Sequence, residues 1–290
     1  MKLLIIRAGA MGDTLMLMPV ISSLKKGAEI TIAGRRPGID YLRPYVARCV
    51  DIETSGRHML FRSGTEDIPD LSLPRFDYVV AFLNDPDGKL MSSLKAFFPE
   101  SAVSVFPVFP QDGDKSHIAL YMAKALKESG LPIDSNRAFE DSLKTPLMSA
   151  IKTAPGERHH IIVHPGSGSI KKNYPPAFWL ELMKEIKRSG FAEQERFTLL
   201  LGPAEEGLLP FFRENLKKGD AVIKAMPERE ELLTILSNAS VYIGHDSGIT
   251  HLAAMMGIHV IAIFKESPIE RWRPLGPNVR LISNTDYSLS

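Results

Sequence analysis

The sequence predicts an α/β protein with two doubly wound domains, each built on a parallel sheet. Short apolar runs rich in β-branched residues alternate with amphipathic stretches along the chain, which is typical of βαβ units. A chain of 290 residues also exceeds the usual length of one compact domain. Ligands of such sheets bind at the carboxyl ends of the strands, so we expect the functional residues there.

The apolar runs place the strands in order along the chain. In the first half the predicted strands are Leu3–Arg7, Glu29–Ala33, Tyr78–Phe82 and Ala102–Phe106. In the second half they are His160–His164, Thr198–Leu201, Ala221–Ile223, Val241–Gly244 and His259–Phe264. The helical spacing of apolar residues predicts helices over Thr14–Leu24, Phe178–Arg188 and Glu231–Ser237. These helices separate the strands, as a parallel sheet requires.

The segment from Asp141 to Arg158 is the best linker candidate, because Pro146, Pro155 and Gly156 break its brief helical spacing. We place the boundary near residue 152, which gives domains over residues 1–152 and 153–290. The carboxyl edges of the two sheets are expected to face each other across a cleft that holds the ligands.

The composition and the N-terminal segment argue against several classes of protein. A net charge of +1 with 24% charged residues argues against a nucleic-acid-binding protein. Cys49 is the only cysteine, which fits a reducing compartment and favours the cytoplasm. The apolar run from Met1 to Ile6 meets Arg7 too soon for a signal peptide or a membrane span.

A run of small polar residues follows the predicted strand that ends near Gly244. Gly244-His245-Asp246-Ser247-Gly248 opens a predicted helix, whose free backbone N–H groups and positive dipole end suit a phosphate. Gly248 would let a ligand approach the backbone, while Asp246, Ser247 and Thr250 could cap the helix. A well-capped helix without a ligand is the alternative interpretation.

A second loop of this kind follows the strand His160–His164. Ser167, Gly168 and Ser169 offer hydroxyl and amide donors, and Lys171 or Lys172 offers a charge suited to a diphosphate. After the strand Thr198–Leu201, the carboxylates of Glu205 and Glu206 could accept hydrogen bonds from a ribose diol. A solvated loop, and surface glutamates at the start of a helix, are the simpler interpretations.

In the first half, Asp13 follows the first strand at the start of a predicted helix. Gly9 and Gly12 remove side chains from the turn, so a ligand hydroxyl could approach Asp13 closely enough for proton abstraction. A helix-capping aspartate is the alternative. Arg35 and Arg36 could instead read an NADP 2′-phosphate, but Arg7 replaces the first glycine of that fingerprint and Asp13 would repel the pyrophosphate.

The sequence does not predict a metal site. His164, His245 and His251 have no neighbouring acidic or thiol cluster with metal-ligand spacing. The pairs Asp85-Pro86-Asp87 and Asp112-Gly113-Asp114 are typical of turns. Lysine and helix dipoles would therefore neutralise a diphosphate without a bound cation or another cofactor.

Three segments of the chain form a recognisable set. They are Arg7-x-Gly9-Ala10-x-Gly12-Asp13, Lys172-x-Tyr174-Pro175 before a helix with Trp179, and Gly244-x-Asp246-Ser247-Gly248-x-x-His251-Leu252-Ala253-Ala254. With Glu270-Arg271-Trp272 they resemble glycosyltransferase family 9, the ADP-heptose:lipopolysaccharide heptosyltransferases. The resemblance implies a GT-B fold of two Rossmann-like domains, with an N-terminal acceptor-binding domain and a C-terminal donor-binding domain. It also implies inverting transfer of the sugar from a nucleotide donor.

The resemblance assigns roles to individual residues of the second half. Lys172 matches the family's phosphate-binding lysine, and Ser167 and Gly168 fall where phosphate-contacting residues lie. Asp246 matches the position that contacts the donor sugar, and the helix that starts at Ser247 would stabilise the leaving group. The remaining residues expected at the donor are Gly248, His251, Glu205 and Glu206.

In the first half, Asp13 matches the family's proposed base. The family's acceptors are acidic lipopolysaccharide core sugars, so we expect Gly12, Arg57 and Arg62 beside the acceptor. Such an acceptor would bring the protein to the inner face of the inner membrane as a peripheral enzyme. Lys265-Glu266-Ser267 departs from the Gly-Pro-Thr segment that is common in the family, which leaves two alternatives. The chain could use a different nucleotide sugar, or bind one without turnover.

Overall fold

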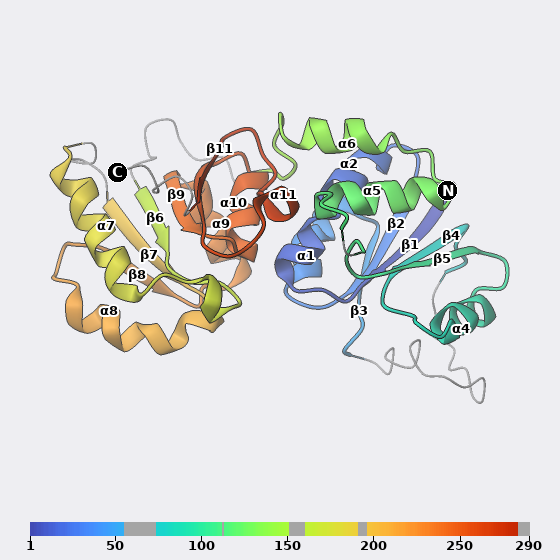
Figure 1. Cartoon of the computed structure of the whole chain (residues 1–290), viewed down its shortest axis with the longest axis horizontal. Coiled ribbons are helices and arrows are strands. Elements are labelled where there is room, and N and C mark those ends of the chain that lie inside the picture. The colour runs from blue at the N-terminus through green and yellow to red at the C-terminus, as the bar shows by residue number, and fades with distance from the viewer. Residues whose placement is uncertain (55–73, 112, 151–159, 191–195, 284–290) are drawn as a thin grey trace. The chain divides into compact units, whose positions relative to one another are not determined.

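The computed structural model describes residues 1–54, 74–111, 113–150, 160–190 and 196–283. The chain divides into two compact units, Met1–Asp141 and Ser142–Ser290, and each contains a parallel sheet with helices around it (Figure 1). The division lies at the start of the expected linker. The boundary expected near residue 152 falls within 151–159, outside the described residues.

The described part of the first unit contains a five-stranded parallel sheet with the order β3-β2-β1-β4-β5. Its strands are β1 (Lys2–Arg7), β2 (Glu29–Gly34), β3 (Arg48–Asp51), β4 (Tyr78–Phe82) and β5 (Ala102–Phe106). β1 pairs with β2 on one side and with β4 on the other, so the strand order reverses between β1 and β4. In doubly wound sheets this switch point is where ligands bind.

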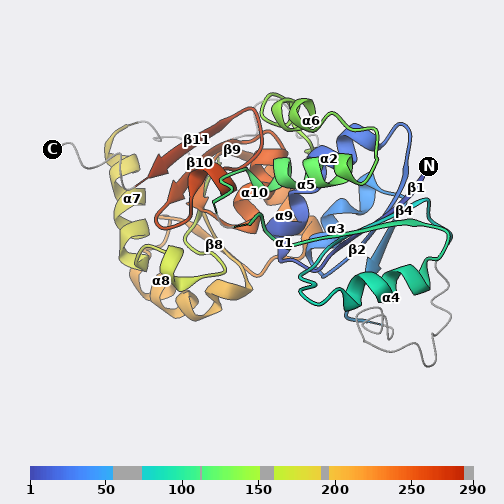
Figure 2. The same cartoon turned by 45° about the vertical axis from the view of Figure 1, so that its right-hand side comes forward.

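The helices of the first unit cover both faces of this sheet. In the described residues they are α1 (Met11–Leu15), α2 (Met18–Leu24), α3 (Gly38–Leu42), the 3-10 turn η1 (Arg43–Tyr45), α4 (Lys89–Phe97), α5 (Ile118–Glu128) and α6 (Ser135–Ser142). α4 lies on the opposite face from α2 and α5 (Figures 1 and 2). β1 is buried on both sides as a result, with at most 1% exposure from Leu3 to Ile6. This burial explains why it is apolar without alternation.

The single helix expected over residues 14–24 is two helices, α1 and α2. Pro19 is the second residue of α2, where its missing N–H breaks no hydrogen bond of that helix. In one continuous helix, the same proline would remove a bond to the carbonyl of Leu15 and crowd the preceding turn. The chain therefore ends α1 at Leu15 and starts again at Met18.

The described part of the second unit contains a six-stranded parallel sheet with the order β11-β10-β9-β6-β7-β8. Its strands are β6 (His160–His164), β7 (Arg196–Leu201), β8 (Val222–Ala225), β9 (Ala239–His245), β10 (His259–Phe264) and β11 (Val279–Ser283). Counted along the unit from β6, this is the 3-2-1-4-5-6 order of dinucleotide-binding folds. The switch point lies between β6 and β9, which pair directly.

The helices of the second unit follow most of these strands. They are η3 (Ile170–Lys172), α7 (Pro176–Arg188), η4 (Pro203–Leu208), α8 (Leu209–Asn215), α9 (Arg229–Ser237), α10 (Gly248–Met255) and α11 (Ile269–Trp272). Trp179 of α7 is fully buried and packs in one cluster with residues of β6, β7 and β9. This cluster fixes α7 on the sheet, and with it the loop that connects β6 to α7.

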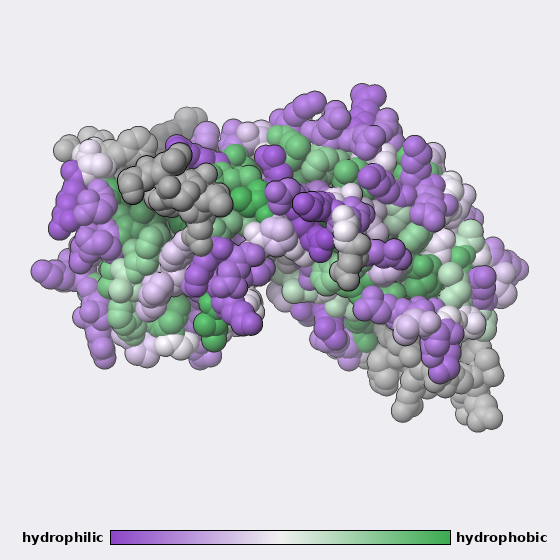
Figure 3. Space-filling view, viewed as in Figure 1, coloured by the Kyte–Doolittle hydropathy of each residue, from purple (hydrophilic) through white to green (hydrophobic). Residues whose placement is uncertain are grey.

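The exposed surface is mixed in character. Figure 3 shows hydrophilic residues over much of the visible face of each unit, with smaller hydrophobic areas between them. Within the described ranges, no helix has the length and apolar character needed to cross a membrane.

Candidate functional site

The predicted phosphate-binding residues of the second unit follow β6 and β9, the two strands at the switch point. β9 ends at His245, and Ser247 is the N-cap residue of α10. The Ser247 hydroxyl accepts a hydrogen bond from the Thr250 N–H at 3.3 Å. The earlier N–H groups of α10, at Gly248 and Ile249, have no acceptor within the helix because of their position in its first turn. They are donors that an anion can use.

Lys172, Asp246 and His251 meet beside the start of α10. The Lys172 ammonium donates to Asp246 Oδ2 at 2.8 Å, and His251 Nε2 lies 3.3 Å from Asp246 Oδ1. Asp246 is only 5% exposed. Burial alone would raise the pKa of its carboxyl, but the hydrogen bond from His251 and the charge of Lys172 hold that pKa below its ordinary value. Asp246 is therefore a carboxylate at neutral pH, and it holds the ammonium beside the helix terminus.

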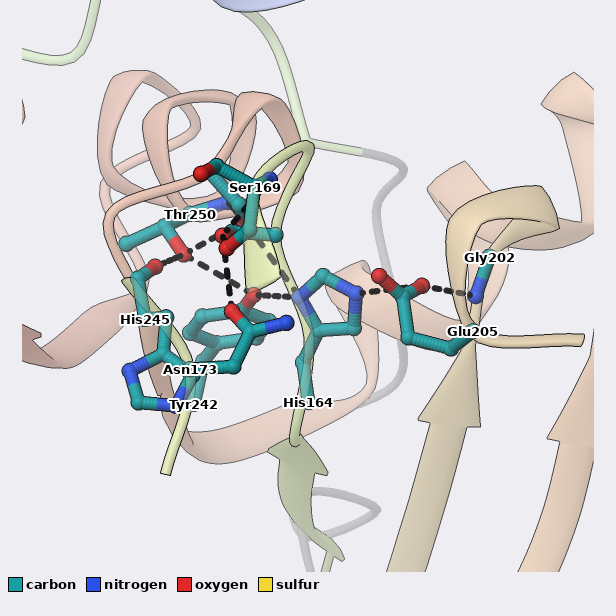
Figure 4. A network of polar contacts seen from close by, with 10 residues as sticks. His164, Ser169, Asn173, Gly202, Glu205, Tyr242, His245 and Thr250 are labelled. Carbon is teal, nitrogen blue, oxygen red and sulfur yellow. Dashed lines mark hydrogen bonds and ion pairs between the residues drawn. The ribbon is translucent and has the colours of Figure 1, made fainter. Parts of the chain in front are cut away.

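His164 is the centre of a second buried network, which Figure 4 shows. Its Nδ1 lies 2.9 Å from the Tyr242 hydroxyl and 3.3 Å from the Ser247 hydroxyl. Thr250 Oγ1 lies 3.0 Å from the hydroxyls of both Tyr242 and Ser247, and it donates to the carbonyl of His245. The hydroxyl of Ser247 is thus engaged in contacts within the protein. We missed Tyr242 in the sequence because it lies inside an apolar strand, where a tyrosine is typical of core packing.

Glu205 lies on the other side of His164. Its Oε2 accepts a hydrogen bond from the Gly202 N–H at 2.8 Å and lies 3.3 Å from His164 Nε2. Burial alone would raise the pKa of Glu205, but the contact with His164 and the Gly202 N–H lower it below its ordinary value. A Cβ on Gly166 would lie 2.0 Å from Glu205 Oε1, so the carboxylate fits only because residue 166 is a glycine. Glu206, the other predicted ribose ligand, is exposed.

The loop between β6 and α7 is braced from within. The Ser167 hydroxyl donates to Asn173 Oδ1 at 2.7 Å, and Ser167 is only 6% exposed. Gly168 is exposed, and a Cβ there would meet no atom within 4 Å. Ser167 therefore shapes the loop, whereas the backbone at Gly168 is open to a ligand.

His245 fastens the end of the same loop. Burial lowers the pKa of His245 to about 4, so its ring is neutral at pH 7, and its Nε2 accepts the Tyr174 N–H at 2.9 Å. The Tyr174 ring lies parallel to the His245 ring at a centroid distance of 5.6 Å. A role for His245 in holding a loop was not evident from its spacing in the sequence.

In the first unit, Asp13 is the third residue of α1. Its Oδ2 accepts the Ala10 N–H at 3.0 Å, so one oxygen caps the helix. Its Oδ1 lies 3.7 Å from Arg7 Nη2, and the side chain is 20% exposed. A Cβ on Gly9 would lie 2.5 Å from the Asp13 Cβ, so the turn requires a glycine there. The capping and the proposed catalytic interpretations are compatible, because they use different oxygens.

Arg7 is fully buried behind Asp13. Its Nη1 donates to the Val108 carbonyl at 2.6 Å, and its guanidinium lies 5.9 Å and 5.5 Å from the ring centroids of Phe82 and Phe109. Burial lowers the pKa of Arg7, although the Asp13 charge acts in the opposite direction. The sequence motif includes Arg7 but does not predict its contact with Asp13 or its burial between Phe82 and Phe109.

Three residues were expected beside the acceptor. Gly12 lies next to Asp13 in α1, and Arg57 and Arg62 lie outside the described residues. In the described residues, no three histidine, cysteine or acidic side chains are grouped so as to hold a metal ion. Asp85 accepts the N–H groups of Leu90 and Met91 at the start of α4.

A comparison with models of known protein families shows to which family the chain belongs. The model of glycosyltransferase family 9 (heptosyltransferase) matches residues 110–290, more than half of the chain. The chain belongs to glycosyltransferase family 9. This match confirms the family predicted from the sequence motifs, and the protein is a glycosyltransferase of the heptosyltransferase family. The matched residues include all of the second-unit site, whereas Asp13 precedes them.

Solved structures of a family 9 glycosyltransferase and of two heptosyltransferases share the fold of the chain. The family 9 glycosyltransferase from Veillonella parvula is 14% identical with a TM-score of 0.69, covering 97% of this chain and 86% of its own. The E. coli heptosyltransferase WaaC with ADP is 15% identical with a TM-score of 0.68, covering 98% and 93%. E. coli ADP-heptose heptosyltransferase II is 17% identical with a TM-score of 0.68, covering 97% and 90%. No curated protein matches the sequence directly. The predicted GT-B fold of two Rossmann-like units is thus confirmed.

Proposed function

We propose that this family 9 protein moves a heptose, or a related sugar, from an ADP-sugar to a lipopolysaccharide core acceptor, with inversion and without a metal ion. The observation that carries this proposal is the Lys172 ammonium held by Asp246 beside the first turn of α10. A lysine and a helix N-terminus at a switch point form an anion site suited to a diphosphate. The relative WaaC, which was solved with ADP, supports adenosine as the nucleoside.

Lys172 and α10 supply positive charge where the leaving group becomes negative. An ammonium has three N–H donors, and Asp246 uses one, so the others can turn to phosphate oxygens. The N–H groups of Gly248 and Ile249 add neutral donors in a fixed orientation. Charge-assisted hydrogen bonds contribute about 1.5–3 kcal/mol each. In this proposal they take the role that a metal ion has in other transferases.

Asp13 is the proposed general base. Because the Ala10 N–H occupies Oδ2, Oδ1 is the oxygen that would take the proton of the acceptor hydroxyl. The hydroxyl oxygen forms a bond to the anomeric carbon as the bond from that carbon to the diphosphate breaks. The bonding electron pair leaves with the diphosphate, and the configuration at the anomeric carbon inverts.

The two units have different proposed roles. The second unit binds the donor, with the backbone at Gly168 and Gly248 next to the phosphates and Glu206 within the ribose region. Glu205, whose carboxylate already contacts His164 and Gly202, is better suited to position His164 than to bind the ribose. The first unit binds the acceptor, with Gly12 next to Asp13 in α1. Arg57 and Arg62 remain the expected contacts of acidic acceptor sugars at the inner face of the inner membrane.

The variant Asp13→Ala separates this proposal from its main alternative, a nucleotide-sugar-binding protein without turnover. We expect the variant to bind ADP like the wild type but to lose sugar transfer by at least 100-fold, as is typical for loss of a general base. Calorimetry with ADP and a transfer assay measure the two properties. Transfer within about tenfold of the wild type would contradict the role of Asp13. ADP binding by a wild type that transfers no sugar would favour the alternative.

A further inference from the structure

Lys265 connects the neighbouring strand to the loop that carries Lys172. It directly follows β10, whose residue Ile263 pairs with His245 of β9, so it lies at the carboxyl edge close to Asp246. Its ammonium donates to the carbonyl of Asn173 at 3.2 Å. Asn173 immediately follows Lys172 in the sequence. Lys265 thus holds the backbone one residue away from the proposed phosphate-binding ammonium.

The same ammonium interacts with an aromatic group that is itself fixed. Lys265 Nζ lies 5.8 Å from the centroid of the Tyr174 ring, within the range of cation–π attraction. The Tyr174 ring stacks on that of Phe178 at 4.6 Å as well as on that of His245. Because Phe178 belongs to α7 and His245 to β9, Tyr174 is anchored to two rigid elements. The contact with Lys265 gives Tyr174 a third anchor, just after the end of β10.

This arrangement joins the two ends of the loop. The backbone carbonyl of Asn173 accepts a hydrogen bond from Lys265, and its side-chain oxygen accepts one from the Ser167 hydroxyl. Asn173 therefore links the residue after β10 to the start of the loop. Lys172 lies between these fixed points and reaches Asp246. A long lysine side chain loses much conformational freedom when it is held in one place. If the backbone at Asn173 is already fixed before the donor binds, less conformational entropy of Lys172 is lost on binding.

We propose that Lys265 is a positioning residue for the binding of the nucleoside diphosphate. Lys265 holds the loop between β6 and α7 so that Lys172 faces the phosphates. This inference rests on the proposed function, because it assumes that a nucleotide binds beside Lys172. Lys265 acts through the loop and need not touch the ligand.

The test compares Lys265→Met with Lys265→Arg and Lys171→Met by calorimetric titration with ADP. Lys171 is an exposed cation of the same loop, so its variant measures the general effect of removing one positive charge. We expect Lys265→Met to weaken ADP binding about tenfold, within the range of coupled neighbours, and Lys171→Met to weaken it less than threefold. Lys265→Arg keeps a cation that can reach the carbonyl and should bind ADP within threefold of the wild type.

A double variant shows whether Lys265 acts through Lys172. If it does, Lys265→Met will have little further effect in a Lys172→Met background. Equal tenfold losses in both backgrounds would mean that Lys265 contacts the nucleotide directly, and would overturn its assignment as a positioning residue. A Kd for ADP in Lys265→Met equal to that of the wild type would also overturn it.

Hydrogen exchange of the ligand-free protein gives a result that does not depend on the proposed function. We expect the amides of residues 170–174 to exchange faster in Lys265→Met than in the wild type, and at wild-type rates in Lys265→Arg. Unchanged exchange in Lys265→Met would show that the residue does not hold the loop. If the wild type binds neither ADP, UDP nor GDP, the proposed function fails, and the exchange rates alone decide whether Lys265 holds the loop.

Discussion

Gly166→Ala should destabilise the second unit, because the site is built around the absence of a side chain at residue 166. The new Cβ would lie 2.0 Å from Glu205 Oε1 and 2.1 Å from its Cγ, so the buried Glu205 side chain must move. It would then lose its contacts with the Gly202 N–H at 2.8 Å and with His164 at 3.3 Å. Buried hydrogen bonds to charged groups contribute about 1.5–3 kcal/mol each. We expect the free energy of unfolding to decrease by about 3 kcal/mol.

Urea unfolding followed by tryptophan fluorescence measures this loss, since Trp179 and Trp272, the two tryptophans, both belong to the second unit. Gly168→Ala is the matched control, because its Cβ would meet no atom within 4 Å and neither glycine has a positive φ. We expect it to change the free energy of unfolding by less than about 0.5 kcal/mol. In a Glu205→Ala background, Gly166→Ala should also have little effect. Wild-type stability of the single Gly166→Ala variant would refute the packing of Glu205 described above.

Two further predictions concern the loop between β6 and α7. Lys172→Met should weaken ADP binding by roughly 10- to 100-fold in calorimetry, because it removes a charge-assisted contact with phosphate; an unchanged Kd would contradict the assigned role of Lys172. His245 should make stability depend on pH, because its folded pKa of about 4 lies below its value of 6.5 in the unfolded chain. Its contribution is present above pH 6.5 and decreases as the pH falls toward 4, with a loss of about 2 kcal/mol between pH 7 and 5. Between pH 7 and 5, the free energy of unfolding of His245→Asn should decrease less than that of the wild type, by that amount. Equal decreases in the wild type and the variant would contradict the prediction.

Apolar runs in the sequence predicted the central strands and also the edge strands β5 and β8. The central strands β1, β4, β6 and β9 are mostly buried, and each contains a short apolar run. We did not predict β3, which lies at one edge of its sheet. β3 begins with Arg48 and contains four residues, so it gives too short an apolar pattern to be recognised.

The candidate site could be predicted as far as backbone geometry determines it. Loops after parallel strands gather at one edge, so Lys172 and Asp246 could be placed together without knowing that they form an ion pair. The partners of buried side chains could not be predicted in this way. The contact of Glu205 with His164 depends on the absence of a Cβ at Gly166. That of Tyr242 with His164 depends on the pairing of His164 with Gly244, where an added Cβ would lie 2.8 Å from the Tyr242 hydroxyl. Such contacts depend on tertiary packing between elements distant in the sequence.

Sugar transfer from ADP-heptose to heptose-deficient lipopolysaccharide, measured with the purified protein in the presence of EDTA, tests the proposed reaction itself. We expect release of ADP, a product with inverted anomeric configuration by NMR, and neither of these with Asp13→Ala. Transfer that requires an added divalent cation, or a product of retained configuration, would contradict the proposed mechanism. ADP binding without any transfer would contradict the claim that this chain moves a heptose to that acceptor.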